Sequence, residues 1–553
     1  MAHYTLGLDY GTESARAVLV DLADGREAAT SVREYPHGVV DEVLPDGGVR
    51  LEPDWALQDA DDYLAVLPAI IREVLERAGT GPAEVIGIGV DFTACTLVPC
   101  RADGAPLSRD PDLRGQPHAW TKLWKHHASQ SQAERINRLA AERAEPFLAR
   151  YGGLSSSEWL FAKAWQMLEE APELYAQAER LVDAGDWLVW QLTGRLTRSA
   201  CQAGYKALWS RAEGYPPSAF LTALDPRLAR LPAEKLVGEV LPVGSRAGCL
   251  TPEMATRLGL QAGTAVATSI IDAHAAVPAA GVSAPGTLVV ILGTSGCHLA
   301  LGHEPRAFAG VAGVVEDGIL PSYTGYEAGQ PATGDILNWF VRQATSGSLE
   351  REAEVRGIAV HQLLSERAAG LRPGEAGLLA LDWWNGNRSV LMDAELSGVL
   401  FGLTLDTRPE HMYRALIEGT AFGTRMILEN LVRNGVPIQQ IVGAGGLSER
   451  HALLMQIYAD VCGRPIRVAR SGQACAVGAA ILGAVAAGSQ AGGYGSIEEA
   501  VGRMGGVRER TYVPDPVAHS RYTEIYEEWV RLHDYLGRGA NPVLKMLRGW
   551  RAA

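Results

Sequence analysis

Residues 6–21 read LGLDYGTESARAVLVD, two apolar runs joined by a glycine turn. The first run ends at Asp9, and apolar runs bounded by Gly, Thr and Ser are typical of a β-hairpin. In the turn, Gly11 and the small hydroxyl residues Thr12 and Ser14 leave backbone N–H groups free to face phosphate oxygens. Asp9 is placed to hold a magnesium ion through water. Taken alone, the stretch also fits a plain hairpin whose acid is satisfied by turn amides.

A second stretch of the same design lies about half a chain away. Residues 287–292 (TLVVIL) are followed by Gly293, Thr294 and Ser295 and by a returning apolar run over residues 297–301. Two such units predict two similar domains, each beginning with a glycine-turned hairpin. Facing turns would hold a polyphosphate from both sides, and phosphoryl transfer needs that positioning and charge stabilisation.

A third glycine cluster, GAGG at residues 443–446, follows an apolar run and precedes a helix-like stretch. A strand, a glycine turn and a helix suit the phosphate or adenosine end of a nucleotide. The cluster lacks the GK[ST] of a Walker A loop, and Ser448 stands where a dinucleotide fingerprint has its third glycine. Downstream, residues 471–480 (SGQACAVGAA) fit either close packing beside an adenine or a small-residue helix packed on a neighbour.

Asp272 is a lone acid in an otherwise uncharged stretch, just before the second hairpin. A carboxylate there is costly unless it is paired or functional, and it could accept a proton from an attacking hydroxyl. The alternative is an N-cap that opens a helix over residues 273–280. The neighbouring His274 is interpreted as structural.

The remaining pattern indicates an α/β protein. Residues 61–78 carry apolar side chains at helical spacing, and residues 84–91 read as a buried strand that ends in an acid. Such alternation favours a parallel or mixed sheet. A helical face from Tyr522 to Leu536 predicts a C-terminal helix packed on the body of the protein.

Composition narrows the function classes. Of the 553 residues, 47% are hydrophobic and 21% are charged, and 50 Lys+Arg against 64 Asp+Glu give a net charge of −14. This argues against non-specific binding of nucleic acid or of an anionic membrane. Phosphate ligands stay possible, because backbone N–H groups can hold them.

Cysteine usage and the N-terminus point to the cytoplasm. Seven cysteines without a CxxC pair argue against a disulfide framework or a zinc site and fit a reducing compartment. The first nine residues lack the basic region of a signal peptide. Two long uncharged stretches, residues 273–302 and 474–496, contain too many Gly, Pro or Ala residues to indicate a spanning helix.

With these motifs together, the chain resembles the FGGY carbohydrate kinases of the actin and hexokinase-like ATPase superfamily. The family resemblance is carried by LDYGTESAR (8–16), GTS (293–295) and GAGG (443–446). Within the family, the subfamily that phosphorylates ribulose is marked by five further motifs: GVDFTACT (89–96), LWKHH (123–127), SSEW (156–159), GYKALW (204–209) and GYEAGQ (325–330). The match extends from about residue 4 to about residue 488.

The resemblance implies the roles of individual residues. Asp272 matches the family's catalytic base. The positions that match ketose contacts, Asp272 included, are Ala94, Lys206, Asp272 and Glu327. The positions that match ATP and phosphate contacts are Asp9, Gly11, Thr12, Ser14, Arg16, Gly293, Thr294, Gly445, Gly446 and Gln473. Asp9 would hold Mg²⁺ through water, and His126 is left without a role.

The same resemblance implies the fold and the reaction. We expect two actin-like (ribonuclease H-like) domains with a central cleft: an N-terminal sugar-binding domain (1–282), a C-terminal nucleotide-binding domain (283–490) and a C-terminal helical extension (491–553). The expected reaction is the ATP- and Mg²⁺-dependent phosphorylation of L-ribulose at its 5-hydroxyl, a step of L-arabinose catabolism.

Two alternatives stay open. One is a kinase of another ketose or polyol, such as D-ribulose, xylulose or glycerol, and the more distant one is an actin- or chaperone-like ATPase. The partners would be a ketopentose and ATP, without nucleic acid or membrane, and the oligomeric state is left open, a homodimer included.

Overall fold

The hairpin of residues 6–21 lies inside a seven-stranded sheet in the computed structural model, which describes residues 3–552. The strand order is β11-β12-β5-β1-β2-β3, with β13 paired to β5. β1 runs antiparallel to β2 and parallel to β5. The strands are β1 (Tyr4–Tyr10), β2 (Ser14–Asp21), β3 (Glu27–Glu34), β5 (Val85–Phe92), β11 (Arg246–Cys249), β12 (Ala265–Ala267) and β13 (Ile270–Ile271).

A second seven-stranded sheet repeats this arrangement, in the order β16-β17-β15-β14-β20-β21-β22. Its hairpin strands β14 and β15 are antiparallel, and β14 runs parallel to β20, as β1 does to β5. The two predicted hairpins therefore occupy equivalent places in two similar sheets. The strands are β14 (Gly286–Leu292), β15 (Gly296–Gly302), β16 (Gly313–Glu316), β17 (Thr324–Gln330), β20 (Ile438–Ala444), β21 (Ile466–Ala469) and β22 (Val507–Tyr512).

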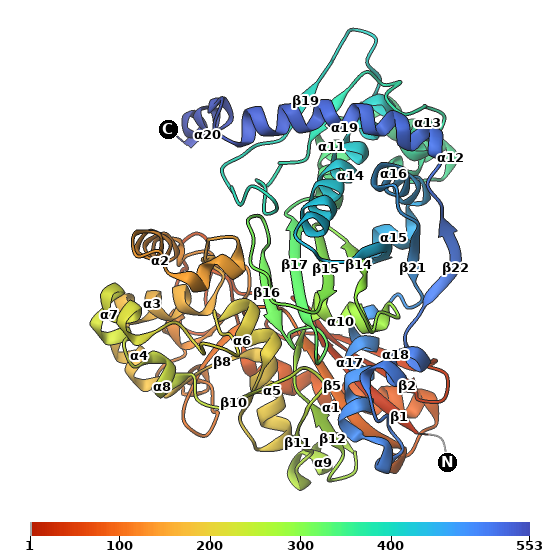
Figure 1. Ribbon diagram of the computed structural model, residues 1–553. Helices are drawn as coiled ribbons and strands as arrows, with labels where there is room; N and C mark the ends of the chain where they lie inside the picture. The colour runs from red at the N-terminus through yellow and green to blue at the C-terminus, as the bar shows by residue number, and fades with distance from the viewer. Residues whose placement is uncertain (1–2, 553) are drawn as a thin grey trace.

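Two helices pack between the sheets, α10 (Asp272–Ala279) and α17 (Ala474–Ala487). α17 comes from the second half of the chain, yet it packs on β1 and β5 of the first sheet (Figure 1). The approach is close, because a side-chain carbon at Gly89 would overlap the carbonyl oxygen of Ala479. Gly478 meets the backbone of α10 in the same way, at Ala275. Small residues therefore bring these backbones into direct contact.

A largely helical part of the first half projects to one side of the first seven-stranded sheet in Figure 1. It includes a four-stranded sheet in the order β4-β7-β6-β8. Its strands are β4 (Leu57–Gln58), β6 (Leu97–Cys100), β7 (Thr121–Lys122) and β8 (Arg180–Asp183), and a separate pair is β9 (Thr197–Ser199) with β10 (Glu239–Leu241). The helices of the first half before α10 are α1 (Ala60–Ala78), α2 (Gln130–Glu142), α3 (Leu160–Glu170), α4 (Pro172–Gln177), α5 (Ala184–Thr193), α6 (Ala200–Lys206), α7 (Ser218–Leu224), α8 (Leu231–Lys235) and α9 (Pro252–Leu258).

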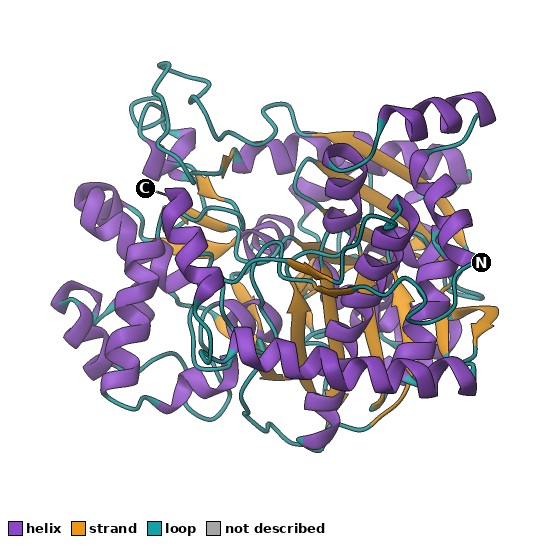
Figure 2. Cartoon of the chain, turned by 90° about the horizontal axis from the view of Figure 1, so that it is seen from above, coloured by secondary structure: helices purple, strands orange, loops and turns teal. Residues whose placement is uncertain are grey.

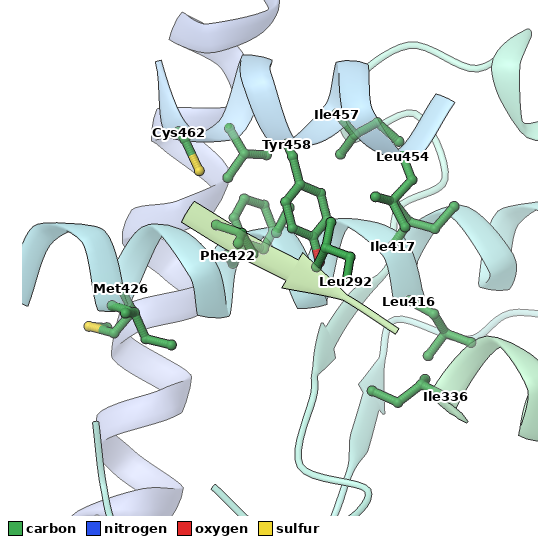
Figure 3. Close-up of a cluster of buried hydrophobic side chains, with 14 of the residues drawn as sticks. Leu292, Ile336, Leu416, Ile417, Phe422, Met426, Leu454, Ile457, Tyr458 and Cys462 are labelled. Carbon is green, nitrogen blue, oxygen red and sulfur yellow. The ribbon is translucent and has the colours of Figure 1, made fainter. Parts of the chain in front are cut away.

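The core of the second half lies between its sheet and the long helix α14. Leu292 of β14 lies beside Phe422 of α14 and Tyr458 of α16, and Met426 of α14 belongs to the same cluster of buried side chains (Figure 3). Viewed from above, helices surround the central strands (Figure 2). The remaining elements of this half are α11 (Gly334–Gln343), α12 (Gly347–Arg356), α13 (Val360–Ala369), β18 (Leu379–Leu381), β19 (Val399–Phe401), α14 (Pro409–Arg433), α15 (Gly446–Arg450) and α16 (Ala452–Cys462).

The C-terminal segment is more than the helical extension that the sequence predicted. It contains α18 (Ile497–Met504), α19 (Pro516–Gly537) and α20 (Val543–Ala552), but also strand β22, which pairs with β21 at the edge of the second sheet. The sequence of β22, VRERTY, is mostly exposed and charged, so it lacks the apolar pattern of a buried strand. Among the described residues, no helix combines the length and apolar character needed to cross a membrane.

Candidate active site

Three carboxylates meet where strands of the first sheet end. Asp9 of β1 and Asp91 of β5 stand opposite each other in the parallel register of the two strands. Asp91 also pairs with Ile270 of β13, and α10 begins with Asp272 directly after that strand. The carboxyl ends of parallel strands share one sheet edge, so the fold gathers the three acids there.

Burial alters the ionisation of two of these acids, Asp91 and Asp272. Burial, together with the charges of Asp9 and Asp272, raises the pKa of Asp91 well above its usual value. Neither Asp91 carboxylate oxygen has a hydrogen-bond partner among the described residues. Burial raises the pKa of Asp272 to about 7, although the N–H of Ala273, which donates to its carboxylate at 2.7 Å, acts in the opposite direction. Near neutral pH, Asp272 can therefore both hold and release a proton.

The structure rejects the interpretation of Asp272 as an N-cap. The N-cap of α10 is Ile271, which makes no side-chain capping bond, and Asp272 is the first residue of the helix. Its carboxylate is half-buried among the other acids of the site.

The first hairpin is braced from outside. Gly11 donates its N–H to the carbonyl of Ser14 at 3.0 Å and closes the turn. Trp124 donates to the Thr12 hydroxyl at 3.0 Å, and Gln58 donates to the Thr12 carbonyl at 2.6 Å. Arg16 pairs with Asp9 at 2.7 Å. The five predicted contact residues of this hairpin therefore lie together at one turn: Asp9, Gly11, Thr12, Ser14 and Arg16.

The second hairpin is braced by the start of α11. Gly293 donates to the carbonyl of Ser295 at 3.0 Å. The N–H of Gly334 donates to the Gly293 carbonyl at 3.0 Å, and the N–H of Thr333 donates to the Thr294 carbonyl at 2.8 Å. The Gly293 and Thr294 carbonyls accept these hydrogen bonds, and Thr294 and Ser295 are exposed. The turn can therefore present their N–H groups and hydroxyls to a ligand.

The third glycine cluster lies beside the second hairpin. Gly445 has a φ of 83°, which favours glycine, and a side-chain carbon there would lie 2.7 Å from the Leu292 carbonyl oxygen. Gly446 follows it as the first residue of α15. This glycine turn therefore fits directly against the end of β14.

Gln473 immediately precedes α17, and its N–H donates to the Ser471 hydroxyl at 2.8 Å. The helix itself is almost wholly buried between the two sheets. Of the two interpretations of residues 471–480, the small-residue packing helix therefore describes residues 474–487. Close to its start, the Cys475 thiol has a pKa raised by burial and by Asp9, Asp91 and Asp272, which places it next to the acids.

A second polar cluster lies across the same interior. Lys206, at the end of α6, contacts both Glu327 carboxylate oxygens at 3.1 Å. Burial acts to raise the pKa of Glu327, but Lys206 outweighs it and holds that pKa well below the usual range. The His274 ring lies 3.4 Å from Glu327 and stacks on Tyr205 with the ring centroids 4.4 Å apart. Lys206 and Glu327 therefore form an ionised pair. This pair joins helix α6 of the first half to strand β17 of the second.

Two further positions singled out from the sequence are Ala94, a predicted ketose contact, and His126, which was given no role. Ala94 is half-buried in the loop after β5, beside Cys95, whose φ is 57°. His126 is fully buried, and its Nε2 contacts the Gln166 side chain at 2.8 Å. Burial lowers the pKa of His126 well below its usual value, so the ring is neutral and acts in packing.

Two residues of the site were not selected from the sequence. Asp91 had a usable signal, because it ends a buried apolar strand as Asp9 does. Arg388 had none, because it lies in an irregular loop between β18 and β19 that carries no periodic pattern. It approaches the site through tertiary structure alone.

Comparisons with known proteins identify this arrangement. Residues 4–278 match the N-terminal domain model of the FGGY family of carbohydrate kinases, and residues 288–487 match the C-terminal domain model. The chain belongs to the FGGY family of carbohydrate kinases. The junction between the two models coincides with the end of α10 and the start of β14.

Individual FGGY relatives match over nearly the whole chain. A ribulokinase of Geobacillus thermodenitrificans is 54% identical over 548 residues, covering 99% of this chain and 97% of its own. A ribulokinase of Halalkalibacterium halodurans is 52% identical and covers 99% and 98%. The solved structure of a xylulose kinase from Rhodospirillum rubrum is 25% identical, with a TM-score of 0.77 and coverage of 97% and 99%. The prediction of a two-domain fold of the actin-like ATPase type is confirmed.

Proposed function

We propose that this chain transfers the γ-phosphoryl group of ATP to the 5-hydroxyl of L-ribulose and forms L-ribulose 5-phosphate. The observation that carries this proposal is the identity of 54% and 52% to relatives named ribulokinase, along essentially the full length of the chain. Two of the five motifs that mark the ribulose subfamily also support it, because Lys206 of GYKALW and Glu327 of GYEAGQ are in direct contact.

We infer that Asp272 is the general base. A base needs a pKa near the working pH so that it is ionised yet can still accept a proton, and burial raises the pKa of Asp272 to about 7. It lies at the first turn of α10, where the charges of Asp9, Lys206 and Glu327 all act on it. The 5-hydroxyl would donate its proton to this carboxylate as its oxygen attacks phosphorus.

The glycine turns would hold the nucleotide. Thr12 and Arg16 of the first hairpin and Thr294 of the second would contact the phosphates, and the turn at Gly445 and Gly446, with Gln473, would lie near adenosine. The turns supply backbone N–H donors, and these donors would stabilise the negative charge on the phosphoryl group during its transfer.

The acids fit a magnesium ion. The carboxylate of Asp91 is buried without a hydrogen-bond partner among the described residues, and Asp91 stands opposite Asp9, so this carboxylate is an unpaired oxygen ligand of the kind Mg²⁺ prefers. Asp9 would hold the ion through water. When bound, Mg²⁺ neutralises phosphate charge.

Lys206, Glu327 and Ala94 would form the ketose pocket. Sugar hydroxyls would satisfy the hydrogen-bonding groups of Lys206 and Glu327. An analogue that lacks these hydroxyls would bind less well, because it would leave those groups without hydrogen-bond partners. Closure of residues 1–282 and 283–490 on the substrates would exclude water, which otherwise competes as phosphoryl acceptor. Residues 491–553 would complete the second half, and we place the protein in the cytoplasm, where its seven free cysteines stay reduced.

The sugar specificity has one serious alternative, another ketose or a polyol, since a xylulose kinase shares the fold. The test is release of ADP by the purified chain with L-ribulose, D-ribulose, both xyluloses, glycerol and no sugar. We expect the highest kcat/KM with L-ribulose and little ADP release without sugar. A higher kcat/KM with xylulose or glycerol would reassign the substrate, and rapid sugar-independent hydrolysis would favour an actin- or chaperone-like ATPase.

A further inference from the structure

The loop between β18 and β19 reaches the sugar side of the site from the second half of the chain. It is fixed in place: the N–H of Gly329 in β17 donates to the Ser389 hydroxyl at 3.1 Å. Backbone groups of Asn387 and Asp393 bond each other at 2.8 Å in both directions and close the loop. Lys545 of α20 pairs with Asp393 at 2.6 Å from the outer side. The loop is therefore a platform that is held against β17 and α20.

Arg388 projects from this platform over the strand that carries Glu327. A side-chain carbon at Gly329 would lie 3.3 Å from Arg388 Cδ and 3.7 Å from Nη1, so the arginine occupies the space above that glycine. Gly329 and Glu327 are two residues apart on β17, and side chains with this spacing share one face of a strand. The guanidinium therefore lies on the same face as the Glu327 carboxylate.

The charges around Arg388 come from both halves of the chain. Burial acts to lower the pKa of Arg388, and the carboxylates of Glu158 and Glu327 raise it more. Glu158 precedes α3 in the first half, next to Trp159, whose ring lies 5.8 Å from the Lys206 ammonium. Arg388 thus faces the first half across the same space that Lys206 and Glu327 line.

Arg388 is nevertheless not committed to a protein partner. Glu327 is already engaged by Lys206 and faces His274, and Arg388 makes no ion pair within residues 3–552. Although protein atoms crowd its guanidinium, the residue stays accessible to solvent. A guanidinium that is held in position but has unused N–H groups is suited to bind an oxygen-rich ligand.

We propose that Arg388 is a substrate-binding residue that donates hydrogen bonds to oxygen atoms of the ketose from the second half of the chain, beside Glu327. This inference rests on the proposed function. Arg388 supplies only donors, whereas Glu327 supplies only acceptors, so together they match the hydroxyl and carbonyl oxygens of a ketose. Arg388 contributes to sugar affinity and selectivity rather than to phosphoryl transfer.

The test compares Arg388→Ala and Arg388→Lys with the wild type, by steady-state kinetics and by calorimetric titration with L-ribulose. Loss of a charge-assisted hydrogen bond should raise the KM and Kd for L-ribulose by ~10- to 100-fold. The KM for ATP should change less than about threefold, because Arg388 contacts the sugar only. Arg388→Lys should recover part of the affinity, since it keeps the charge without the planar fork.

The matched control is Arg356→Ala, which removes an arginine of the same half from a surface pair with Glu366. It should behave as the wild type. Sugar affinity unchanged in both Arg388 variants would overturn the inference, and so would a loss of kcat with unchanged sugar affinity, which would place Arg388 at the phosphate. If the wild type turns over another sugar but not ribulose, the proposed function fails; the same titration with that sugar then decides whether Arg388 binds it.

Discussion

Asp272 derives its reactivity from its surroundings rather than from its residue type. Burial raises its pKa to about 7, and Asp9 and Glu327 act in the same direction, whereas Lys206 and the N–H of Ala273 oppose them. The same fold keeps Glu327 ionised through Lys206. The surroundings therefore shift the pKa values of the two carboxylates in opposite directions: Asp272 can exchange a proton, and Glu327 stays charged.

Replacement of Asp272 by asparagine should lower kcat by ~100-fold or more, because the variant keeps the shape but cannot accept a proton. Binding of a non-hydrolysable ATP analogue, measured by calorimetry, should stay within a few-fold of the wild type. Turnover close to that of the wild type would remove Asp272 from its proposed role.

The pH profile should reveal the raised pKa directly. A general base acts when deprotonated, so kcat/KM for ribulose should be constant above pH ~7 and fall about tenfold per pH unit below it. The profile is measured from pH 5 to 9 at saturating ATP, and the Asp272→Asn variant should lose this limb. An acid limb near pH 4, the range of an ordinary carboxylic acid, would contradict the assignment.

The residues of the site differ in how easily they can be recognised from the sequence alone. Asp272 stands out because an acid in an uncharged stretch is costly, and Asp9 because it borders a recognisable turn. Asp91 was overlooked although it ends a strand in the same way as Asp9. Arg388 could not be found, since only the folding of its loop onto Gly329 brings it to the site.

At the level of elements, α17 joins the two halves. It follows a strand of the second sheet, packs on β1 and β5 of the first, and lies against α10, which carries Asp272. Its small residues permit this contact, and the sequence left open whether they face a neighbour or an adenine. Burial on all sides, rather than periodicity, decides the matter.

Gly478→Ala should destabilise the protein, because the added methyl group would overlap the Ala275 carbonyl oxygen of α10. We expect a loss of ~1–3 kcal/mol in the free energy of unfolding, measured by urea titration, and a lower melting temperature. The control is Gly502→Ala in α18, where the new methyl group would meet nothing within 4 Å. Its higher helix propensity should leave stability unchanged or raise it by up to ~1 kcal/mol. A Gly478→Ala protein as stable as the wild type would contradict the packing described for α17.

Elements with a clear apolar pattern were predictable. The helix over residues 61–78 is confirmed as α1 and the strand over 84–91 as β5, within a residue at each end. β22 was missed because an exposed edge strand rich in charge has no buried face to impose alternation.

At the scale of the whole molecule, two copies of one sheet arrangement face a shared interior. Each supplies a hairpin, and each sends a helix, α10 or α17, into the space between the sheets. The sequence indicated the duplication through its two hairpins, since local turn chemistry survives without tertiary context. How the lysine of α6 meets the glutamate of β17 depends on long-range packing, and only the family resemblance pointed to those two residues in advance.

The central claim is that the sugar binds between these halves with its reacting hydroxyl at Asp272. The most direct measurement is a crystal structure of the protein with L-ribulose, Mg²⁺ and a non-hydrolysable ATP analogue. We predict the 5-hydroxyl oxygen at ~2.6–3.2 Å from an Asp272 carboxylate oxygen and facing the γ-phosphate. A ribulose bound elsewhere, or bound with its 5-hydroxyl turned away from Asp272, would contradict the account.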